Sequence, residues 1–232
     1  MNKRISFFDG VRGFTMISMA LFHATYDLAY INGMELPWFT QGSFQDIWRA
    51  SISWVFLFIA GWMCSLSRNN GKRALKYAAA AALVWVATTV ASVDDSVNFG
   101  IIFCMAASTA LFVVAEPLLE RIPWAVGMLS CLVLFTLTWS VPRTVYPVPG
   151  LAWLGFPSPG FVSGDYYPMV PFTFMFLAGW FASKGMRGRA FPQWMQRGLC
   201  KPLESLGRHA LPFYLLHQPI ILGVIELVYS VR

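Results

Sequence analysis

Residues 122–141 carry no charged side chain and read Ile122-Pro-Trp-Ala-Val-Gly-Met-Leu-Ser-Cys-Leu-Val-Leu-Phe-Thr-Leu-Thr-Trp-Ser-Val141. A helix needs about 20 predominantly apolar residues to cross the hydrocarbon core of a bilayer, and this run has that length. Six more apolar segments cover 11–33, 47–67, 74–93, 97–116, 169–184 and 205–231. The sequence therefore predicts an all-α integral membrane fold, a bundle of about seven transmembrane helices that forms a single domain over residues 1–232.

The composition of the 232-residue chain agrees with this fold class. Hydrophobic residues make up 57% of the chain, charged residues only 12%, and the mean hydropathy is +0.56. Soluble domains carry about 25% charged residues, so a soluble core of this size could not hide so much apolar surface. The composition excludes a disordered protein, a coiled coil, a disulfide scaffold and an ordinary cytosolic enzyme. The four cysteines lack metal-ligand spacing, so neither a zinc site nor a disulfide framework is predicted.

The distribution of basic residues predicts the topology. With the N-terminus inside, fourteen Lys and Arg residues, among them Lys3 and Arg4, fall on the inner side, and only Arg49, Arg143 and Arg232 fall outside. Cytoplasmic loops accumulate Lys and Arg, so we expect a cytoplasmic N-terminus, an external C-terminus and a place in a bacterial inner membrane. The net charge of +6 then reflects topology, and no nucleic-acid partner is expected.

One short motif occurs twice. Phe56-Leu-Phe-Ile-Ala-Gly-Trp62 is matched by Phe174-Met-Phe-Leu-Ala-Gly-Trp180. Ala-Gly allows two helices to approach closely, and tryptophan is typical of the membrane–water interface. We interpret the repeat as similar helix-end chemistry rather than a gene duplication.

The first segment carries ionisable residues, which a membrane span rarely keeps without a function. Asp9 and Arg12 lie one turn apart at its cytoplasmic end, where they either anchor the helix or serve a ligand. His23 lies about 16 Å deeper along a helix. His23 and Asp27 are spaced i,i+4, so the carboxylate can orient the imidazole and stabilise its protonated form. The pair is a candidate general base, and the alternative is a buried pair that only packs helices together.

The last segment contains Pro212 and Pro219, which bend a helix and free backbone carbonyls. Such bends are tolerated where the backbone lines a cavity. Tyr214 and His217 are one turn apart, and His217 is near mid-depth, where it can meet His23. The alternative is a histidine bonded only to the carbonyls that the prolines free.

A third polar group, Ser163-Gly-Asp-Tyr-Tyr-Pro168, ends the outer loop 142–168. The prolines of this loop exclude an α-helix, and we expect it to pack over the outer mouth of the bundle. Asp165 can cap the helix that follows. The functional alternative is an acceptor site in which Tyr166 or Tyr167 forms a stacking surface.

Three blocks of the sequence resemble a known family. Arg4-Ile-Ser-Phe-Phe-Asp9-Gly-Val-Arg12-Gly13, leading to His23 and Asp27, resembles the opening of the DUF1624 family, which is grouped with the catalytic region of heparan-alpha-glucosaminide N-acetyltransferase. Two further blocks are similar to it: Ser163 to Pro168, and Leu206-Gly-Arg-His-Ala-Leu-Pro-Phe-Tyr-Leu-Leu-His-Gln-Pro219. Arg12 and His23 also have the Arg-x10-His spacing of acyltransferase-3 membrane enzymes, whose first-helix histidine is considered catalytic.

The resemblance implies a membrane-embedded acyltransferase. It would move an acyl group, acetyl in the family, from cytosolic acetyl-CoA or another acyl-CoA to a hydroxyl or amino group of a sugar-containing acceptor at the outer face. The lysosomal enzyme is thought to use a histidine in the loop after its first span, but residues 34–46 contain none. The catalytic role therefore falls on His23, our first candidate, or on His217.

The expected site has three parts. Catalysis is assigned to His23 and Asp27, coenzyme A binding to Asp9, Arg12, Tyr214 and His217, and acceptor binding to Asp165, Tyr166 and Tyr167. Expected partners are the bilayer, acyl-CoA and a glycan or glycolipid acceptor, with a homodimer as one option for the assembly, and no metal is expected. Two alternatives stay open: a small proton-coupled transporter that uses the same polar groups as a relay, and a non-catalytic membrane partner subunit.

Overall fold

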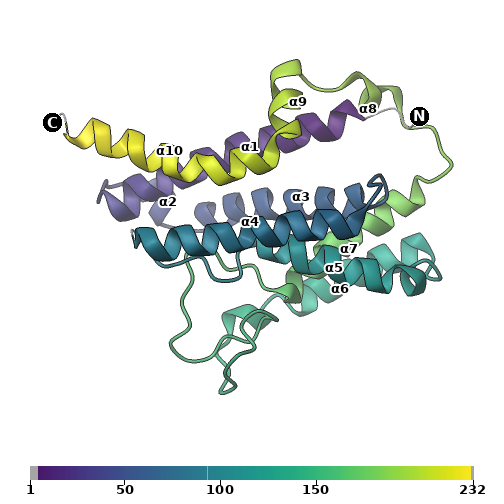
Figure 1. The fold of residues 1–232 in the computed structure, drawn as a ribbon, viewed down its shortest axis with the longest axis horizontal. Helices are drawn as coiled ribbons and strands as arrows, with labels where there is room; N and C mark the ends of the chain where they lie inside the picture. Colours follow the sequence, from purple (N-terminus) through teal and green to yellow (C-terminus); the bar gives the residue numbers. More distant parts are fainter. Residues whose placement is uncertain (1–4, 93, 231–232) are drawn as a thin grey trace. The chain divides into compact units, whose positions relative to one another are not determined.

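The computed structural model describes residues 5–92 and 94–230, so Lys3, Arg4 and Arg232 of the charge count lie outside the described residues. Within this part of the chain 71% of residues are helical and no strand occurs. The helices are α1 (Ser6–Tyr26), the π-helical turn η1 (Asp27–Ile31), α2 (Pro37–Thr40), α3 (Phe44–Cys64), α4 (Asn70–Ala91), α5 (Ile101–Leu119), α6 (Trp124–Leu137), the 3-10 turn η2 (Val141–Arg143), α7 (Met169–Gly185), α8 (Gln193–Arg197), α9 (Lys201–Arg208) and α10 (Ala210–Ser230) (Figure 1). The predicted all-helical fold is confirmed.

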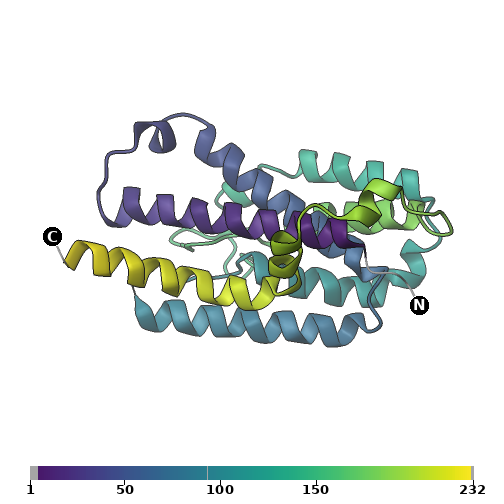
Figure 2. The same ribbon diagram turned by 90° about the horizontal axis from the view of Figure 1, so that it is seen from above.

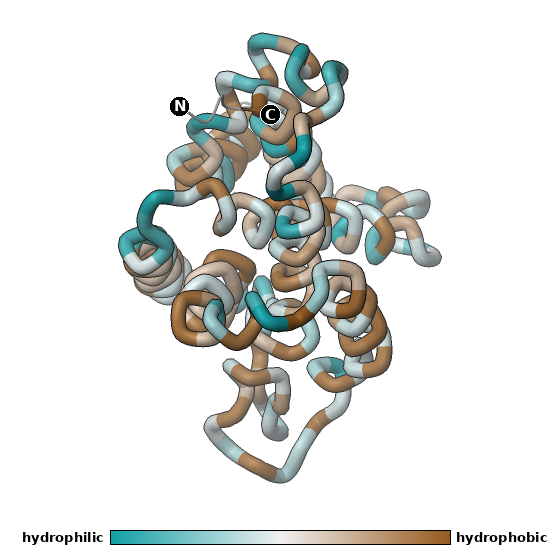
Figure 3. Tube along the Cα trace, turned by 90° about the vertical axis from the view of Figure 1, so that its right-hand side faces the viewer, coloured by the Kyte–Doolittle hydropathy of each residue, from teal (hydrophilic) through white to brown (hydrophobic). Residues whose placement is uncertain are grey.

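Five stretches are long and apolar enough to cross a membrane: α3, α4, α5, α10, and Trp124–Arg143, which contains α6 and η2. Hydrophobic residues recur along the helical turns (Figure 3), and many large ones are exposed, such as Val114 at 80%. Helices α1 and α7 coincide with predicted segments but are not among the five, and α7 has 17 residues. The membrane-protein class is confirmed, and the count of seven spans stays a prediction.

The chain forms two compact units. The first comprises residues 1–56 and 190–232, and the second comprises Leu57–Arg189. In the first unit α1 packs against α8, α9 and α10, and Figure 2 shows α1 and α10 running side by side. In the second unit α4 packs on α5, while α7 packs on both α5 and α6. The interpretation of the chain as a single domain stays a prediction.

The repeated motif explains how α3 meets α7 in the second unit. A Cβ atom added to Gly61 would lie 1.7 Å from the carbonyl oxygen of Phe176, and one added to Gly179 would lie 1.9 Å from that of Phe58. Each glycine therefore packs directly on the backbone of the other copy, which only a residue without a side chain allows. The tryptophans of the motif, Trp62 and Trp180, are buried. They fill the core next to this crossing, and their expected place at the membrane surface stays a prediction.

Two glycines bring the first and third sequence blocks together in the first unit. A Cβ atom at Gly13 of α1 would lie 1.9 Å from the carbonyl oxygen of Leu203, and one at Gly207 of α9 would lie 1.8 Å from that of Asp9. Helix α9 leads through His209 into α10. This backbone contact therefore sets where α10 begins beside α1, and it positions the side chains described next.

Candidate active site

The structure places His23 of α1 next to His217 of α10, within the first unit. Their ring centroids are 5.0 Å apart and the planes are inclined by 58°. Aromatic rings hold both imidazoles: Phe22 meets His23 edge-on at 5.8 Å, and Phe213 stacks on His217 with planes 12° apart. His23 is half-buried, whereas only 8% of His217 is exposed. The two histidines come from helices at opposite ends of the chain.

The tautomer of His217 follows from its hydrogen bond. Its Nδ1 atom lies 2.6 Å from the carbonyl oxygen of Tyr214. A carbonyl oxygen only accepts, so Nδ1 carries the hydrogen, and in the neutral ring Nε2 keeps a lone pair. This Nε2 atom is buried and finds no hydrogen-bond partner in the described part of the chain. A buried acceptor without a hydrogen bond destabilises the folded state by about 1–3 kcal/mol. The Nε2 lone pair of His217 is therefore available to act as a base beside His23.

Asp27 takes a partner that the sequence reasoning missed. Its side chain is buried, and both of its carboxylate oxygens accept hydrogen bonds from Nε2 of Gln218, at 2.9 and 3.1 Å. The ring of His23 lies against the rings of Phe22 and His217. The signal that could have identified Gln218 is an amide in the middle of an apolar span, directly before Pro219.

The backbone changes its helical form at Asp27. The chain passes from α-helix to π-helix at Asp27, where the N–H group of Asn32 donates to the Asp27 carbonyl five residues earlier. The N–H group of Asp27 still donates to the carbonyl oxygen of His23, so the two residues keep their i,i+4 register and the wider turn begins only after Asp27. Single π turns inside helices occur frequently at functional sites.

Arg12 and Asp9 form the ion pair that their spacing predicts. The guanidinium donates to the Asp9 carboxylate through Nη2, and its Nε lies 3.4 Å from the carbonyl oxygen of Phe8. The Asp9 side chain is 4% exposed and that of Arg12 is 24% exposed. The buried carboxylate therefore orients a cation that solvent still reaches.

A comparison with protein families identifies the chain. Residues 4–219 match the family described as heparan-alpha-glucosaminide N-acetyltransferase, catalytic. The chain belongs to this family. The match includes all three sequence blocks and both His23 and His217, so the family predicted from those blocks is confirmed. No curated protein and no solved structure matched the chain.

Membership in the heparan-alpha-glucosaminide N-acetyltransferase family makes the chain a membrane acetyltransferase of a group that uses acetyl-CoA as donor. Among the residues that the structure describes, no three His, Cys, Asp or Glu side chains gather as metal ligands would.

The second block of this family member, Ser163 to Pro168, lies in the second unit, whereas the histidines lie in the first. Asp165 accepts a hydrogen bond at 3.1 Å from the backbone N–H group of Ile101 and so caps α5. The expectation that it caps the following helix is wrong, because the loop folds back onto the start of α5. The Tyr166 hydroxyl donates to the carbonyl oxygen of Ala152 at 2.7 Å, and burial raises the pKa of Tyr166 to about 12. Tyr167 is buried and packs on Phe172.

Proposed function

We propose that this acetyltransferase moves an acyl group from cytosolic acyl-CoA to a hydroxyl or amino group of a sugar-containing acceptor at the outer face of the membrane. The His23–His217 pair would handle the proton. One observation carries the proposal: two imidazoles from opposite ends of the family match lie 5.0 Å apart, and one of them has a buried Nε2 atom without a partner among the described residues.

His23 is the base that meets the acceptor, because it is half-buried whereas His217 is buried. His23 takes the proton from the acceptor as its oxygen or nitrogen atom forms a bond to the carbonyl carbon of the thioester. The carbon–sulfur bond breaks, the electron pair leaves with sulfur, and the thiolate takes up a proton to become a free thiol. General-base help of this kind is worth about 10²–10⁴-fold in rate.

Two neighbours support a positive charge on His23. The lone pair on Nε2 of His217 can accept a hydrogen from the charged ring. Asp27 lies one turn along from His23, and Gln218 holds its carboxylate in place. A buried negative charge is poorly screened, so it stabilises a nearby imidazolium more than an exposed carboxylate would.

The remaining assignments concern binding. Arg12, oriented by Asp9 and partly exposed, would hold a phosphate group of coenzyme A through charge-assisted hydrogen bonds. Tyr214, whose ring centroid lies 5.6 Å from that of His217, would help to position the thioester. A role of Asp165, Tyr166 and Tyr167 in acceptor binding stays a prediction, since Asp165 and Tyr166 already bond within their own unit.

We also propose the orientation and location. The charge bias supports seven spans that include α1 and α7, a cytoplasmic N-terminus, an external C-terminus and a bacterial inner membrane. Reporter fusions after residues 68–76 and 184–201 test this topology. Reporters of both segments should be active on the cytoplasmic side, and external activity of either one contradicts it.

The activity test uses the purified full chain in detergent. It is incubated with acetyl-CoA and a panel of amino sugars and hydroxyl sugars, while free thiol and product mass are measured together. We expect thiol release matched by an acetylated sugar, and no release from a variant that lacks both His23 and His217. Proton-coupled transport without thiol release would favour the transporter. Activity only in the presence of another chain would favour a partner subunit.

A further inference from the structure

A polar pocket of about 440 Å³ lies within the second unit, and none of the residues that line it has been assigned a role above. Its walls are residues 64, 65 and 67–71, which end α3, connect it to α4 and begin α4, together with Val113 and Glu116 of α5 and Arg187 after α7. Helices α3, α4 and α5 are all candidate membrane spans, and they end or begin here. The pocket therefore lies where membrane-crossing helices reach the headgroup layer.

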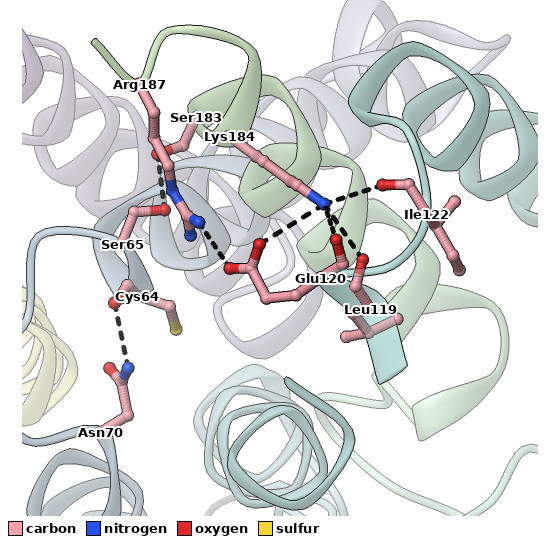
Figure 4. A network of polar contacts seen from close by, with 9 residues as sticks. All are labelled: Cys64, Ser65, Asn70, Leu119, Glu120, Ile122, Ser183, Lys184 and Arg187. Atoms are coloured by element: carbon pink, nitrogen blue, oxygen red, sulfur yellow. Dashed lines mark hydrogen bonds and ion pairs between the residues drawn. The ribbon is translucent and has the colours of Figure 1, made fainter. Parts of the chain in front are cut away.

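A network of polar contacts holds the surrounding chain segments together (Figure 4). Lys184 donates from Nζ to the carbonyl oxygens of Leu119, Glu120 and Ile122, at 3.3, 2.7 and 2.8 Å. Arg187 pairs with the Glu120 carboxylate, and Ser183 donates to Ser65 at 2.6 Å. The ends of α5 and α7 and the α3–α4 connection are thus tied to one another around the pocket.

Three groups at the pocket lack hydrogen-bond or ion-pair partners among the described residues. Asn70 donates from Nδ2 to the carbonyl oxygen of Cys64 at 3.0 Å, but its Oδ1 atom is buried and accepts nothing in the described chain. Glu116 is half-buried, and Arg68 is exposed. Neither side chain makes a hydrogen bond or an ion pair with any described residue. The pocket thus combines two acceptors that need donors with one guanidinium that needs an anion.

We propose that this pocket binds a phosphate ester that also carries a protonated primary amine, the headgroup chemistry of phosphatidylethanolamine. The ammonium group would donate to Asn70 Oδ1 and to the Glu116 carboxylate. The phosphate would pair with Arg68, near the positive N-terminal end of α4. The site is independent of the proposed acyl transfer.

The test compares lipids that differ in one feature of the headgroup. The full chain is delipidated in detergent and titrated with short-chain phosphatidylethanolamine, phosphatidylcholine or phosphatidylglycerol, and bound lipid is counted by native mass spectrometry. Phosphatidylcholine keeps the charges but has no N–H donor, and phosphatidylglycerol keeps the phosphate but has no amine. We expect phosphatidylethanolamine to bind about tenfold more tightly than either, as the loss of charge-assisted hydrogen bonds implies.

Variants locate the binding in this pocket. Glu116→Gln should abolish the preference for phosphatidylethanolamine over phosphatidylcholine, and Arg68→Ala should weaken binding of both lipids. Arg189→Ala, which removes an exposed arginine outside the pocket, should change neither. Melting temperatures check that each variant is folded, and Arg68 is exposed, so its variant is informative even if Glu116→Gln is unstable.

Competition with soluble phosphoethanolamine distinguishes a free phosphate ester from a membrane lipid as the ligand. Displacement of the lipid at similar concentrations identifies a free ester as the ligand, and failure to displace it identifies the membrane lipid. Equal binding of phosphatidylethanolamine and phosphatidylcholine overturns the proposal. So does a preference that survives both Glu116→Gln and Arg68→Ala.

Discussion

Gln218 donates hydrogen bonds to both carboxylate oxygens of Asp27, at 2.9 and 3.1 Å, across 191 positions of sequence. The contact joins the π turn after α1 to the middle of α10. Because Gln218 directly follows His217, the same contact fixes the rotation of α10 that brings His217 beside His23. The register between the two helices and the geometry of the histidine pair are therefore coupled.

Reversing this hydrogen bond tests the coupling. Gln218→Glu places two carboxylates in contact and should lower both the free energy of unfolding and the turnover, with a stability loss of about 1–3 kcal/mol. Adding Asp27→Asn lets the new amide donate to the new carboxylate, so the double variant should regain stability. A double-mutant cycle of unfolding in detergent measures this interaction. A coupling energy near zero would show that the contact does not hold the helices together.

Removal of the His23 imidazole should abolish acyl transfer while acyl-CoA still binds. The expected loss of turnover in His23→Ala is at least about 100-fold, the lower end for a general base. Asp27→Asn should have a milder effect, because the ring remains but loses a nearby charge. His209→Ala is the matched control, since His209 is exposed. Near-normal turnover of folded His23→Ala, with turnover lost in His217→Ala, would move the base to α10.

Arg12→Ala should weaken acyl-CoA binding by about tenfold to a hundredfold, because charge-assisted hydrogen bonds to phosphate are lost. Equilibrium binding of acetyl-CoA to the purified variant measures the effect. Arg49→Ala is the control: Arg49 pairs with Asp46 at the same i,i+3 spacing, and both side chains are exposed. Unchanged affinity in Arg12→Ala would leave Arg12 as an interfacial anchor of α1.

The α3–α7 crossing should not tolerate a methyl group. Gly61→Ala and Gly179→Ala should each destabilise the protein by about 1–3 kcal/mol, because the added Cβ forces two backbones apart. Gly223→Ala on α10 has no atom within 4 Å of the added Cβ. It should be neutral or slightly stabilising, since alanine is the better helix former. Thermal unfolding of the three variants in one detergent provides the comparison.

Glu120 should make stability depend on pH in the acid range. Burial on its own would raise the pKa of Glu120, but hydrogen bonds and charge from Arg187 and Lys184 outweigh it and hold the pKa below 4.5. Its stabilising effect is therefore complete above pH 4.5 and is lost as the pH falls through the lowered pKa. Glu120→Gln should lose less stability than the unmodified chain between pH 5 and 3, whereas Glu35→Gln, at an exposed site, should not differ from it. If the free energy of unfolding falls with pH in parallel for the unmodified chain and Glu120→Gln, this prediction is contradicted.

The local pattern of the chain was enough to predict its class and family. Long uncharged runs such as 122–141 can only be buried in lipid, so the all-helical membrane fold follows from composition and length. The polar residues left in the apolar segments are few and costly, and this rarity alone marks His23, Asp27 and His217 as candidate functional residues. The two glycines of the repeated motif likewise predicted a close helix contact.

Only the tertiary structure decided which of these groups bond to each other. Helical periodicity places His23 and Asp27 on one face, but it does not show the Gln218 amide that takes the carboxylate. In the same way, Asp165 precedes α7 in sequence but caps α5, because the outer loop folds back. The spacing of residues along the chain predicts which side chains share a face of one helix. The partners across helices depend on how each helix is rotated and packed, which is a property of the whole fold.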